Sequence, residues 1–270
     1  SPTEITVSQL SRLIGTPSMP VLVDVCIDAD FNADPRLIPG AFRHPAADIA
    51  RLAPSLAGRA VIVTCQKGRK MSQGAAAILR AHGIAAETLE GGNFAWRDAG
   101  EPLVPVSAIP PLNSQGQSVW VTRLRPKIDR IACPWLIRRF VDPSAQFLFV
   151  SPSEVLSVAE KFNATPFDVE DVFWSHRGER CTFDTMVDEF SLHIPALEHL
   201  ATIVRGADTD ALGLAPQAAG LLALSLGLSR MHRDDLMQLD ASMGLYDALY
   251  RWARDAAEET HDWPADKARS

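Results

Sequence analysis

The residues best suited to chemistry form one short loop, with the sequence Thr-Cys-Gln-Lys-Gly-Arg-Lys at positions 64–70. An apolar run, Ala60–Val63, precedes this loop, and a run of small residues with helical spacing, Met71–His82, follows it. A strand, a tight glycine-containing loop and a helix make an anion cradle, because loop N–H groups and the helix N-terminus converge on one point. A thiol at the first position of such a loop, here Cys65, has its thiolate form favoured and is therefore nucleophilic. We predict that Cys65 is a catalytic thiol; the alternative is a buried cysteine beside a solvated basic turn.

The remaining loop residues are predicted to bind the substrate. Three of them are cations, so the expected ligand is a small anion. The predicted binding residues are Gln66, Lys67, Gly68, Arg69 and Lys70.

Length and composition limit the classes of protein that fit. At 270 residues, with 47% hydrophobic and 22% charged residues, the chain favours two globular domains. A net charge of −7 argues against nucleic-acid binding by the whole surface. The four cysteines show no C-x-x-C pair and no disulfide spacing, which suits a reducing compartment. Because neither a signal-peptide pattern nor a bilayer-spanning apolar run is visible, we expect a cytoplasmic protein without a membrane partner.

The first half alternates between patterns typical of strands and helices. Such alternation predicts an α/β domain with a parallel sheet, whose ligands bind beyond the carboxyl ends of the strands. The predicted elements are a short opening helix that includes Leu10, a buried strand Val21–Val25, a short helix Asp48–Ala53 stopped by Pro54, the strand Ala60–Val63, the helix Met71–His82 and the strand Ala86–Leu89.

Several motifs of this half together resemble a single rhodanese domain. They are Asp24-Val25, Ile38-Pro39-Gly40-Ala41, the loop that starts at Cys65, and Leu89-Glu90-Gly91-Gly92 with Trp96 and Gly100-Glu101-Pro102. The resemblance implies sulfur transfer. The Cys65 thiolate would take a sulfane sulfur from a small anionic donor, thiosulfate or a persulfide, and pass the resulting persulfide sulfur to an acceptor. Cys26 stands where the family usually has arginine and Leu37 where histidine is common, departures that bear on loop anchoring and turnover.

A segment rich in proline, serine, glutamine and glycine separates the two halves. Pro110-Pro111 favours extended backbone and cannot join a helix, so this segment reads as a linker. The predicted division is a rhodanese-like domain at 1–105, a linker at 106–118, a second domain at 119–256 and a polar tail at 257–270.

The second half is predicted to be mainly helical with a small sheet, an α+β arrangement. Strands are expected at Val119–Thr122 and Gln146–Val150, and helices at Pro152–Phe162, Pro195–Arg205, Ala211–Leu228 and Arg233–Ala253. Apolar residues recur at helical spacing between Ile128 and Phe140. Pro134 either kinks that helix or opens a shorter one, in which case Cys133 would cap a helix N-terminus and be a second reactive thiol. The other interpretation of Cys133 is a core cysteine.

The run from Arg123 to Phe140 closely resembles the opening of the chromate-resistance (ChrB-type) domain. Three further blocks share the resemblance, namely His176–Asp184, Val204–Thr209 and Tyr246–Tyr250. The whole chain is therefore similar to a sulfurtransferase/chromate-resistance fusion, and chromate becomes an expected partner.

Chromate is a tetrahedral oxyanion, and guanidinium groups match its oxygens bidentately. The candidate oxyanion site consists of Arg123, Arg125, Lys127, Arg130 and Cys133. The alternative is a structural arginine–carboxylate network completed by Asp129 and Asp142.

A metal ion is the other ligand considered for the second half. Suitable nitrogen, oxygen and sulfur donors occur at His176, Glu179, Cys181, Asp184 and Asp208, without a dense ligand motif. We prefer His176 and Asp208 as metal ligands, because both lie in the blocks that resemble the chromate-resistance domain. A structural role for the histidine is the alternative.

The expected function is persulfide formation at Cys65, fused to a chromate-resistance domain that binds an oxyanion or a metal. The alternative is a chromate or redox sensor, or an accessory protein, with a weak or inactive rhodanese domain. Direct nucleic-acid binding is not expected, because no helix-turn-helix with a basic recognition helix is apparent.

Overall fold

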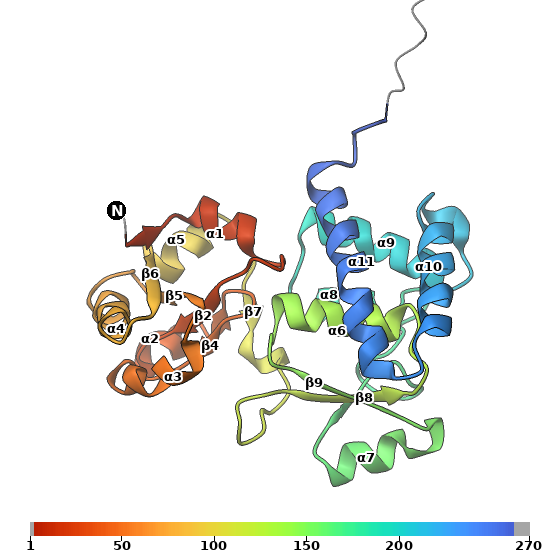
Figure 1. Ribbon diagram of the computed structural model, residues 1–270, viewed down its shortest axis with the longest axis horizontal. Helices are drawn as coiled ribbons and strands as arrows, with labels where there is room; N and C mark the ends of the chain where they lie inside the picture. Colours follow the sequence, from red (N-terminus) through yellow and green to blue (C-terminus); the bar gives the residue numbers. More distant parts are fainter. Residues whose placement is uncertain (1–2, 262–270) are drawn as a thin grey trace, which may run out of the picture.

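The computed structural model describes residues 3–261, which form two lobes joined by an irregular segment (Figure 1). The N-terminal lobe contains a five-stranded parallel sheet in the order β1-β6-β5-β2-β4. Its strands are β1 (Glu4–Ile5), β2 (Val21–Asp24), β4 (Phe42–Arg43), β5 (Ala60–Thr64) and β6 (Ala85–Leu89). The predicted α/β class with a parallel sheet is confirmed for this lobe.

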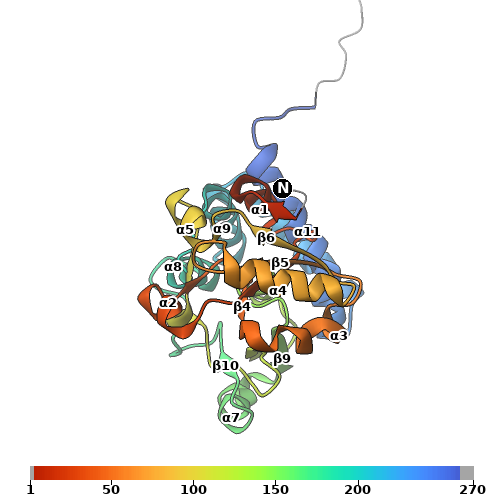
Figure 2. The ribbon, with the colours of Figure 1, turned by 90° about the vertical axis from the view of Figure 1, so that its left-hand side faces the viewer.

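Helices cover both faces of this sheet. Helices α1 (Val7–Leu13) and α5 (Gly92–Asp98) lie on one side, and α2 (Asp28–Ala33), α3 (Ala53–Leu56) and α4 (Lys70–Ala81) on the other (Figure 1). In the view onto this lobe, α4 lies in front of β5 and β6 (Figure 2). Because both faces are covered, the residues of β5 from Val61 to Val63 are all apolar and buried, as is typical of a central parallel strand. A small antiparallel pair, β3 (Arg36–Leu37) and β7 (Val104–Pro105), closes the lobe.

Pro54 starts a helix where the sequence predicted that it stops one. A 3₁₀ helix spans Ala46–Leu52, and α3 follows it directly with Pro54 in its first turn. Proline is tolerated there because the first N–H groups of a helix have no intrahelical acceptor. The prediction of one helix ending at Ala53 was therefore wrong.

Within the described residues, the C-terminal lobe pairs a three-stranded parallel sheet with six α-helices. The sheet has the order β10-β8-β9, with β8 (Val119–Arg123), β9 (Gln146–Val150) and β10 (Thr165–Pro166). Helix α7 (Val155–Lys161) covers one face (Figure 1). The other face carries α6 (Asp129–Phe140), α8 (Thr182–Glu189), α9 (Pro195–Asp208), α10 (Ala218–Met231) and α11 (Asp235–Asp255). The predicted mainly helical α+β arrangement is confirmed.

Two prolines bear on the helices predicted for this lobe. Pro134 lies inside α6, so the alternative in which a shorter helix begins there was wrong. The stretch predicted as one helix from Ala211 instead forms a short 3₁₀ turn, Leu212–Leu214, and α10 begins only at Ala218, after Pro216.

The lobes contact one another through α1 and α11. Arg12 donates to both carboxylate oxygens of Asp255, at 2.8 and 3.2 Å, and Arg254 donates to the Arg12 carbonyl at 3.0 Å. Next to α1, Gly15 has a φ of +77° and lies directly against the Phe140 ring, where a Cβ would be 2.2 Å from that ring. We retain the division at 106–118 as a proposal. The predicted tail at 257–270 lies mostly outside the described residues.

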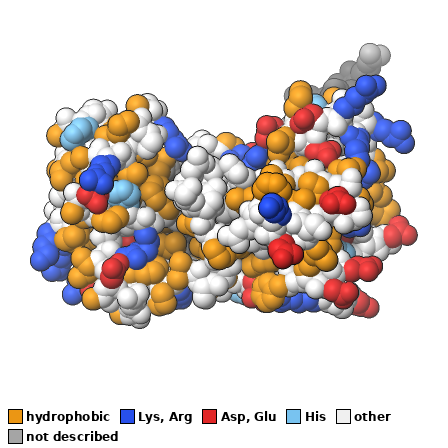
Figure 3. Space-filling view, turned by 90° about the horizontal axis from the view of Figure 1, so that it is seen from below, with side chains coloured by type: hydrophobic (Ala, Val, Ile, Leu, Met, Phe, Trp, Pro, Cys, Tyr) orange, Lys and Arg blue, Asp and Glu red, His pale blue; other side chains and the backbone are white. Residues whose placement is uncertain are grey.

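Two further features concern the charge of the surface and the apolar length of the helices. Acidic and basic side chains are interspersed over both lobes on the face shown in Figure 3, which among the described residues presents no continuous basic surface. No helix between residues 3 and 261 is long and apolar enough to cross a membrane.

We expect Asp247→Asn to lower the free energy of unfolding by about 2–3 kcal/mol, because Asp247 joins α11 to α6. Its carboxylate accepts from Arg139 Nε and Nη2 and from Trp135 Nε1, each at 2.8 Å. Urea unfolding measures the change. The matched control is Asp240→Asn, since the Asp240 side chain is 69% exposed and, among residues 3–261, pairs only with Arg138. This variant should cost no more than about 0.5 kcal/mol. Equal costs for the two variants would contradict this account of α6–α11 packing.

Candidate functional site

Cys65 lies where the sequence placed it, directly after β5 at the carboxyl edge of the sheet. Asp24 of β2 pairs with Thr64 of β5, so the two strands end side by side. Cys65 itself is 5% exposed, and its Sγ lies 3.2 Å from the Ser72 hydroxyl in the first turn of α4. The sulfur therefore sits at the floor of the loop against a polar group, with little of its surface exposed.

The backbone around Cys65 offers a run of free hydrogen-bond donors. Within residues 3–261, none of the five consecutive N–H groups of Gln66, Lys67, Gly68, Arg69 and Lys70 donates to another protein group. The Lys67, Arg69 and Lys70 side chains are exposed and form no ion pair with any described residue. Free N–H groups and unpaired cations at the start of a helix are the groups that bind anions.

Two glycines allow the loop to pack on the turn after β6. The Asn93 N–H donates to the Cys65 carbonyl and the Phe94 N–H to the Gln66 carbonyl, each at 3.0 Å. A Cβ on Gly92 would lie 2.3 Å from both the Cys65 carbonyl oxygen and the Gly68 nitrogen. Gly68 and Gly92 also have positive φ angles, 65° and 63°. Only glycine meets both the steric and the conformational requirement.

Asn93 connects the loop to the neighbouring strands and was not singled out from the sequence. Its side-chain amide donates to Asp24 at 3.0 Å, and its amide oxygen accepts from the Thr64 hydroxyl at 2.6 Å. In the sequence, Asn93 directly follows the Gly91-Gly92 motif, and this position was the available indication that it belongs to the site. Asn93 therefore fixes the first residue of the loop from both β2 and β5.

Cys26 is the second thiol near this site. Asn93 lies 3.5 Å from its sulfur, and Arg43 donates to its carbonyl at 2.9 Å. Burial, with the Asp24 carboxylate beside it, raises the pKa of the Cys26 thiol far above the usual range. Cys26 therefore stays protonated and does not compete as a nucleophile. Leu37, the other residue that differs from the usual rhodanese pattern, is buried in β3. Neither Cys26 nor Leu37 disturbs the fold.

The five residues of the candidate oxyanion site do not converge. The Arg125 guanidinium turns toward the end of α10, where it contacts the Ser229 and His232 carbonyls. Cys133 is fully buried, and burial together with nearby carboxylates raises its pKa well above the usual range, so the expectation of a reactive thiol is corrected. Lys127 is half-buried and forms no ion pair among the described residues.

The remaining two arginines face a carboxylate that the sequence analysis did not name. Arg123 Nη2 and Arg130 Nε lie 3.6 and 3.5 Å from the same oxygen of Asp168. The alternative network completed by Asp129 and Asp142 is also not formed, since Asp142 accepts from Ser118 and Asp129 faces elsewhere.

The preferred metal pair, in contrast, is brought together. His176 Nε2 lies 3.1 Å from an Asp208 oxygen, 3.3 Å from Asp129 and 3.4 Å from Asp168. These carboxylates raise the pKa of His176, while complete burial raises the pKa of Asp129. Of the other donors considered, Cys181 and Asp184 cap α8, and Arg205 occupies the Asp184 carboxylate at 2.8 Å.

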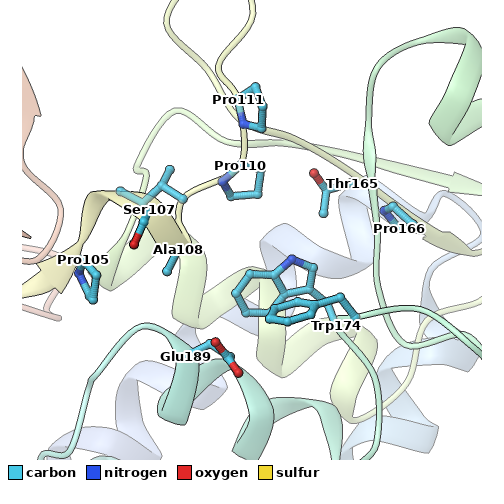
Figure 4. A pocket seen from close by; sticks show the side chains of 11 residues that line it. Pro105, Ser107, Ala108, Pro110, Pro111, Thr165, Pro166, Trp174 and Glu189 are labelled. Atoms are coloured by element: carbon cyan, nitrogen blue, oxygen red, sulfur yellow. The ribbon is translucent and has the colours of Figure 1, made fainter.

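A surface cavity lies between the proline-rich linker and the C-terminal lobe (Figure 4). Pro110 and Pro111 of the linker face Trp174 and Pro166 across it (Figure 4). Its lining, within the described residues, includes none of the predicted site residues.

Two family matches divide the chain as the geometry does. Residues 6–99 match the rhodanese-like domain, and residues 120–253 match the family described as ChrB, C-terminal domain. The chain joins a rhodanese-like domain to a ChrB C-terminal domain. The resemblances stated from the sequence are thereby confirmed.

The ChrB likeness extends to a curated protein. The chain is 32% identical over 170 residues to Protein ChrB of Cupriavidus metallidurans, an alignment that covers 57% of this chain and 50% of that protein. The chain thus spans about half the length of the curated relative it matches.

Solved structures similar to the rhodanese-like domain include two proteins from different organisms. A rhodanese-related protein from Thermoplasma volcanium is 22% identical with a TM-score of 0.33, covering 37% of this chain and 96% of that one. A rhodanese-like domain protein from Staphylococcus aureus is 30% identical with a TM-score of 0.31, covering 35% of this chain and 90% of that one.

Proposed function

We propose that the rhodanese-like domain is a sulfurtransferase that forms a persulfide on Cys65. The observation that carries this proposal is the run of five consecutive loop N–H groups, Gln66 to Lys70, none of which has an acceptor in the part of the protein that the structure describes. These donors directly follow the residue that holds the thiol, and Lys67, Arg69 and Lys70 in the same run are exposed and unpaired among residues 3–261. Such surroundings stabilise a negatively charged sulfur species better than a neutral thiol.

The reaction has two balanced steps. The Cys65 thiolate attacks the outer sulfur of thiosulfate; a sulfur–sulfur bond forms to Cys65 and the bond to the inner sulfur breaks, which releases sulfite. An acceptor nucleophile, cyanide in the assay, then attacks the terminal persulfide sulfur and leaves as thiocyanate, which restores the thiolate. Lys67, Arg69 and Lys70 would hold the donor anion, and the Ser72 hydroxyl would hydrogen-bond to the sulfur.

The experiment is a steady-state assay of the full chain with thiosulfate and cyanide, in which thiocyanate is measured. We expect turnover that saturates with thiosulfate and is inhibited by sulfite, the first product. A rate equal to that of the reagents alone, at every thiosulfate concentration, would overturn the proposal.

The ChrB domain carries the link to chromate resistance in this proposal. Direct capture of chromate by Arg123, Arg125 and Arg130 is not supported, because protein oxygens already face all three guanidinium groups. We therefore propose no oxyanion site in the ChrB domain. Sulfur transfer is assigned to the rhodanese-like domain alone.

A further inference from the structure

Four residues from separate parts of the ChrB domain meet beyond the carboxyl ends of its parallel strands. Asp129 begins α6, which follows β8, and Asp168 follows β10. His176 lies in the connection to α8, and Asp208 is the last residue of α9. This edge of a parallel sheet is where α/β folds place their ligands.

The distances among these groups match metal coordination better than hydrogen bonding. His176 Nε2 faces three carboxylates at 3.1, 3.3 and 3.4 Å, although one N–H cannot donate straight bonds to three acceptors. Charge-assisted N–H···O bonds are also shorter, about 2.7–2.9 Å. Ligand atoms on a tetrahedral metal with bonds of about 2.0–2.2 Å are about 3.3–3.6 Å apart, and neighbouring octahedral ligands are about 3.0 Å apart.

Two of the carboxylates, those of Asp129 and Asp168, are held in place by donors from the start of α8. The Asp129 oxygens accept from the N–H groups of Thr182 and Phe183 at 2.7 and 3.2 Å. Asp168 accepts from the Thr182 hydroxyl at 2.8 Å. Hydrogen bonds of this kind fix the orientation of metal-binding side chains before the ion arrives.

Charge and access also suit a cation. Asp129 is completely buried, so its negative charge needs a positive partner at close range. The His176 side chain is 40% exposed, which leaves a route from solvent to the group. Ligand atoms of Asp129, His176 and Asp208 all lie within 4.8 Å of one another, so a single ion can contact the three.

We propose that Asp129, His176 and Asp208, with Asp168 beside them, form a binding site for one divalent first-row transition-metal ion. Carboxylate oxygens with an imidazole nitrogen suit Mn²⁺, Fe²⁺ or Zn²⁺, whereas Ca²⁺ takes oxygen ligands only. The site is separate from the Cys65 loop and does not depend on sulfur transfer.

The test uses the full chain after treatment with a chelator. Mn²⁺ is titrated and followed by electron paramagnetic resonance, and Zn²⁺ and Ca²⁺ are titrated by calorimetry. We expect one equivalent of Mn²⁺ or Zn²⁺ to bind, Ca²⁺ to bind at least about 10-fold more weakly, and Asp208→Asn to weaken Mn²⁺ and Zn²⁺ binding by about 10-fold or more.

Asp210→Asn is the matched control, because Asp210 is exposed two residues further on and carries the same charge. It should bind as the wild type does, and so should Cys65→Ser. If Asp208→Asn fails to fold by circular dichroism, His176→Gln, at a half-exposed position, replaces it and should show the same loss. No saturable binding of Mn²⁺ or Zn²⁺ by the wild type, or unchanged binding by the folded site variant, would overturn the proposal.

Discussion

Cys65→Ser protein should form no thiocyanate above background, a loss of about 10³-fold or more in turnover, because a neutral hydroxyl cannot replace the sulfur nucleophile. Serine is close in size to cysteine, and the position is nearly buried, so the loop and its hydrogen bond to Ser72 should persist. Circular dichroism should therefore show a folded protein. The measurement is thiocyanate formation at saturating thiosulfate.

Cys26→Ser is the control for this result, since Cys26 is the other thiol near the loop. Its pKa is raised by burial, so it takes no part as a thiolate, and its replacement should leave turnover within about 3-fold of the wild type. Equal activities of the wild type and Cys65→Ser would show that the chemistry lies elsewhere. Loss of activity in Cys26→Ser but not in Cys65→Ser would show that Cys26, and not Cys65, is the nucleophile.

Gly92→Ala should reduce sulfur transfer by about 100-fold or more, because the loop must move to admit the new methyl group. The added Cβ would meet the Cys65 carbonyl oxygen and the Gly68 nitrogen at 2.3 Å, and both are backbone atoms that cannot turn away. We also expect a loss of about 2–4 kcal/mol in the free energy of unfolding, from the clash and from the positive φ. Thiocyanate formation and urea unfolding measure the two effects.

Gly100→Ala separates the clash from the backbone strain. Gly100 has a φ of +76°, but a Cβ there meets nothing within 4 Å. This variant should lose only about 1 kcal/mol of stability and keep its activity. Similar activities for Gly92→Ala and Gly100→Ala would contradict the description of the loop as held in place by the turn after β6.

The Cys65 loop could be predicted because its parts are contiguous in the sequence. Cys65, Gly68 and the following helix lie within a few residues of one another, and a buried strand precedes them, so local patterns placed the thiol correctly. Asn93 lies far along the chain, and its contacts with Asp24 and Thr64 exist only once the sheet is formed. The position of Asn93 directly after the Gly91-Gly92 motif was the one local indication, and it does not specify these contacts.

The ChrB domain shows the opposite situation. Arg125 lies in a basic run, yet its partners are carbonyls at the end of α10, more than one hundred positions away. A run of cations in sequence therefore did not become a cluster in space. His176 and Asp208 lie 3.1 Å apart, and their role as metal ligands stays a proposal. The sequence analysis assigned Asp129 to arginines, because only the fold brings α6 against the start of α8.

Mass spectrometry of the protein after brief exposure to thiosulfate tests the central claim most directly. The account predicts that the peptide containing Cys65 gains the mass of one sulfur atom, that cyanide removes it, and that no other cysteine peptide changes. A wild-type protein that remains unmodified at Cys65, or that carries the added sulfur on Cys26, Cys133 or Cys181 instead, would contradict it.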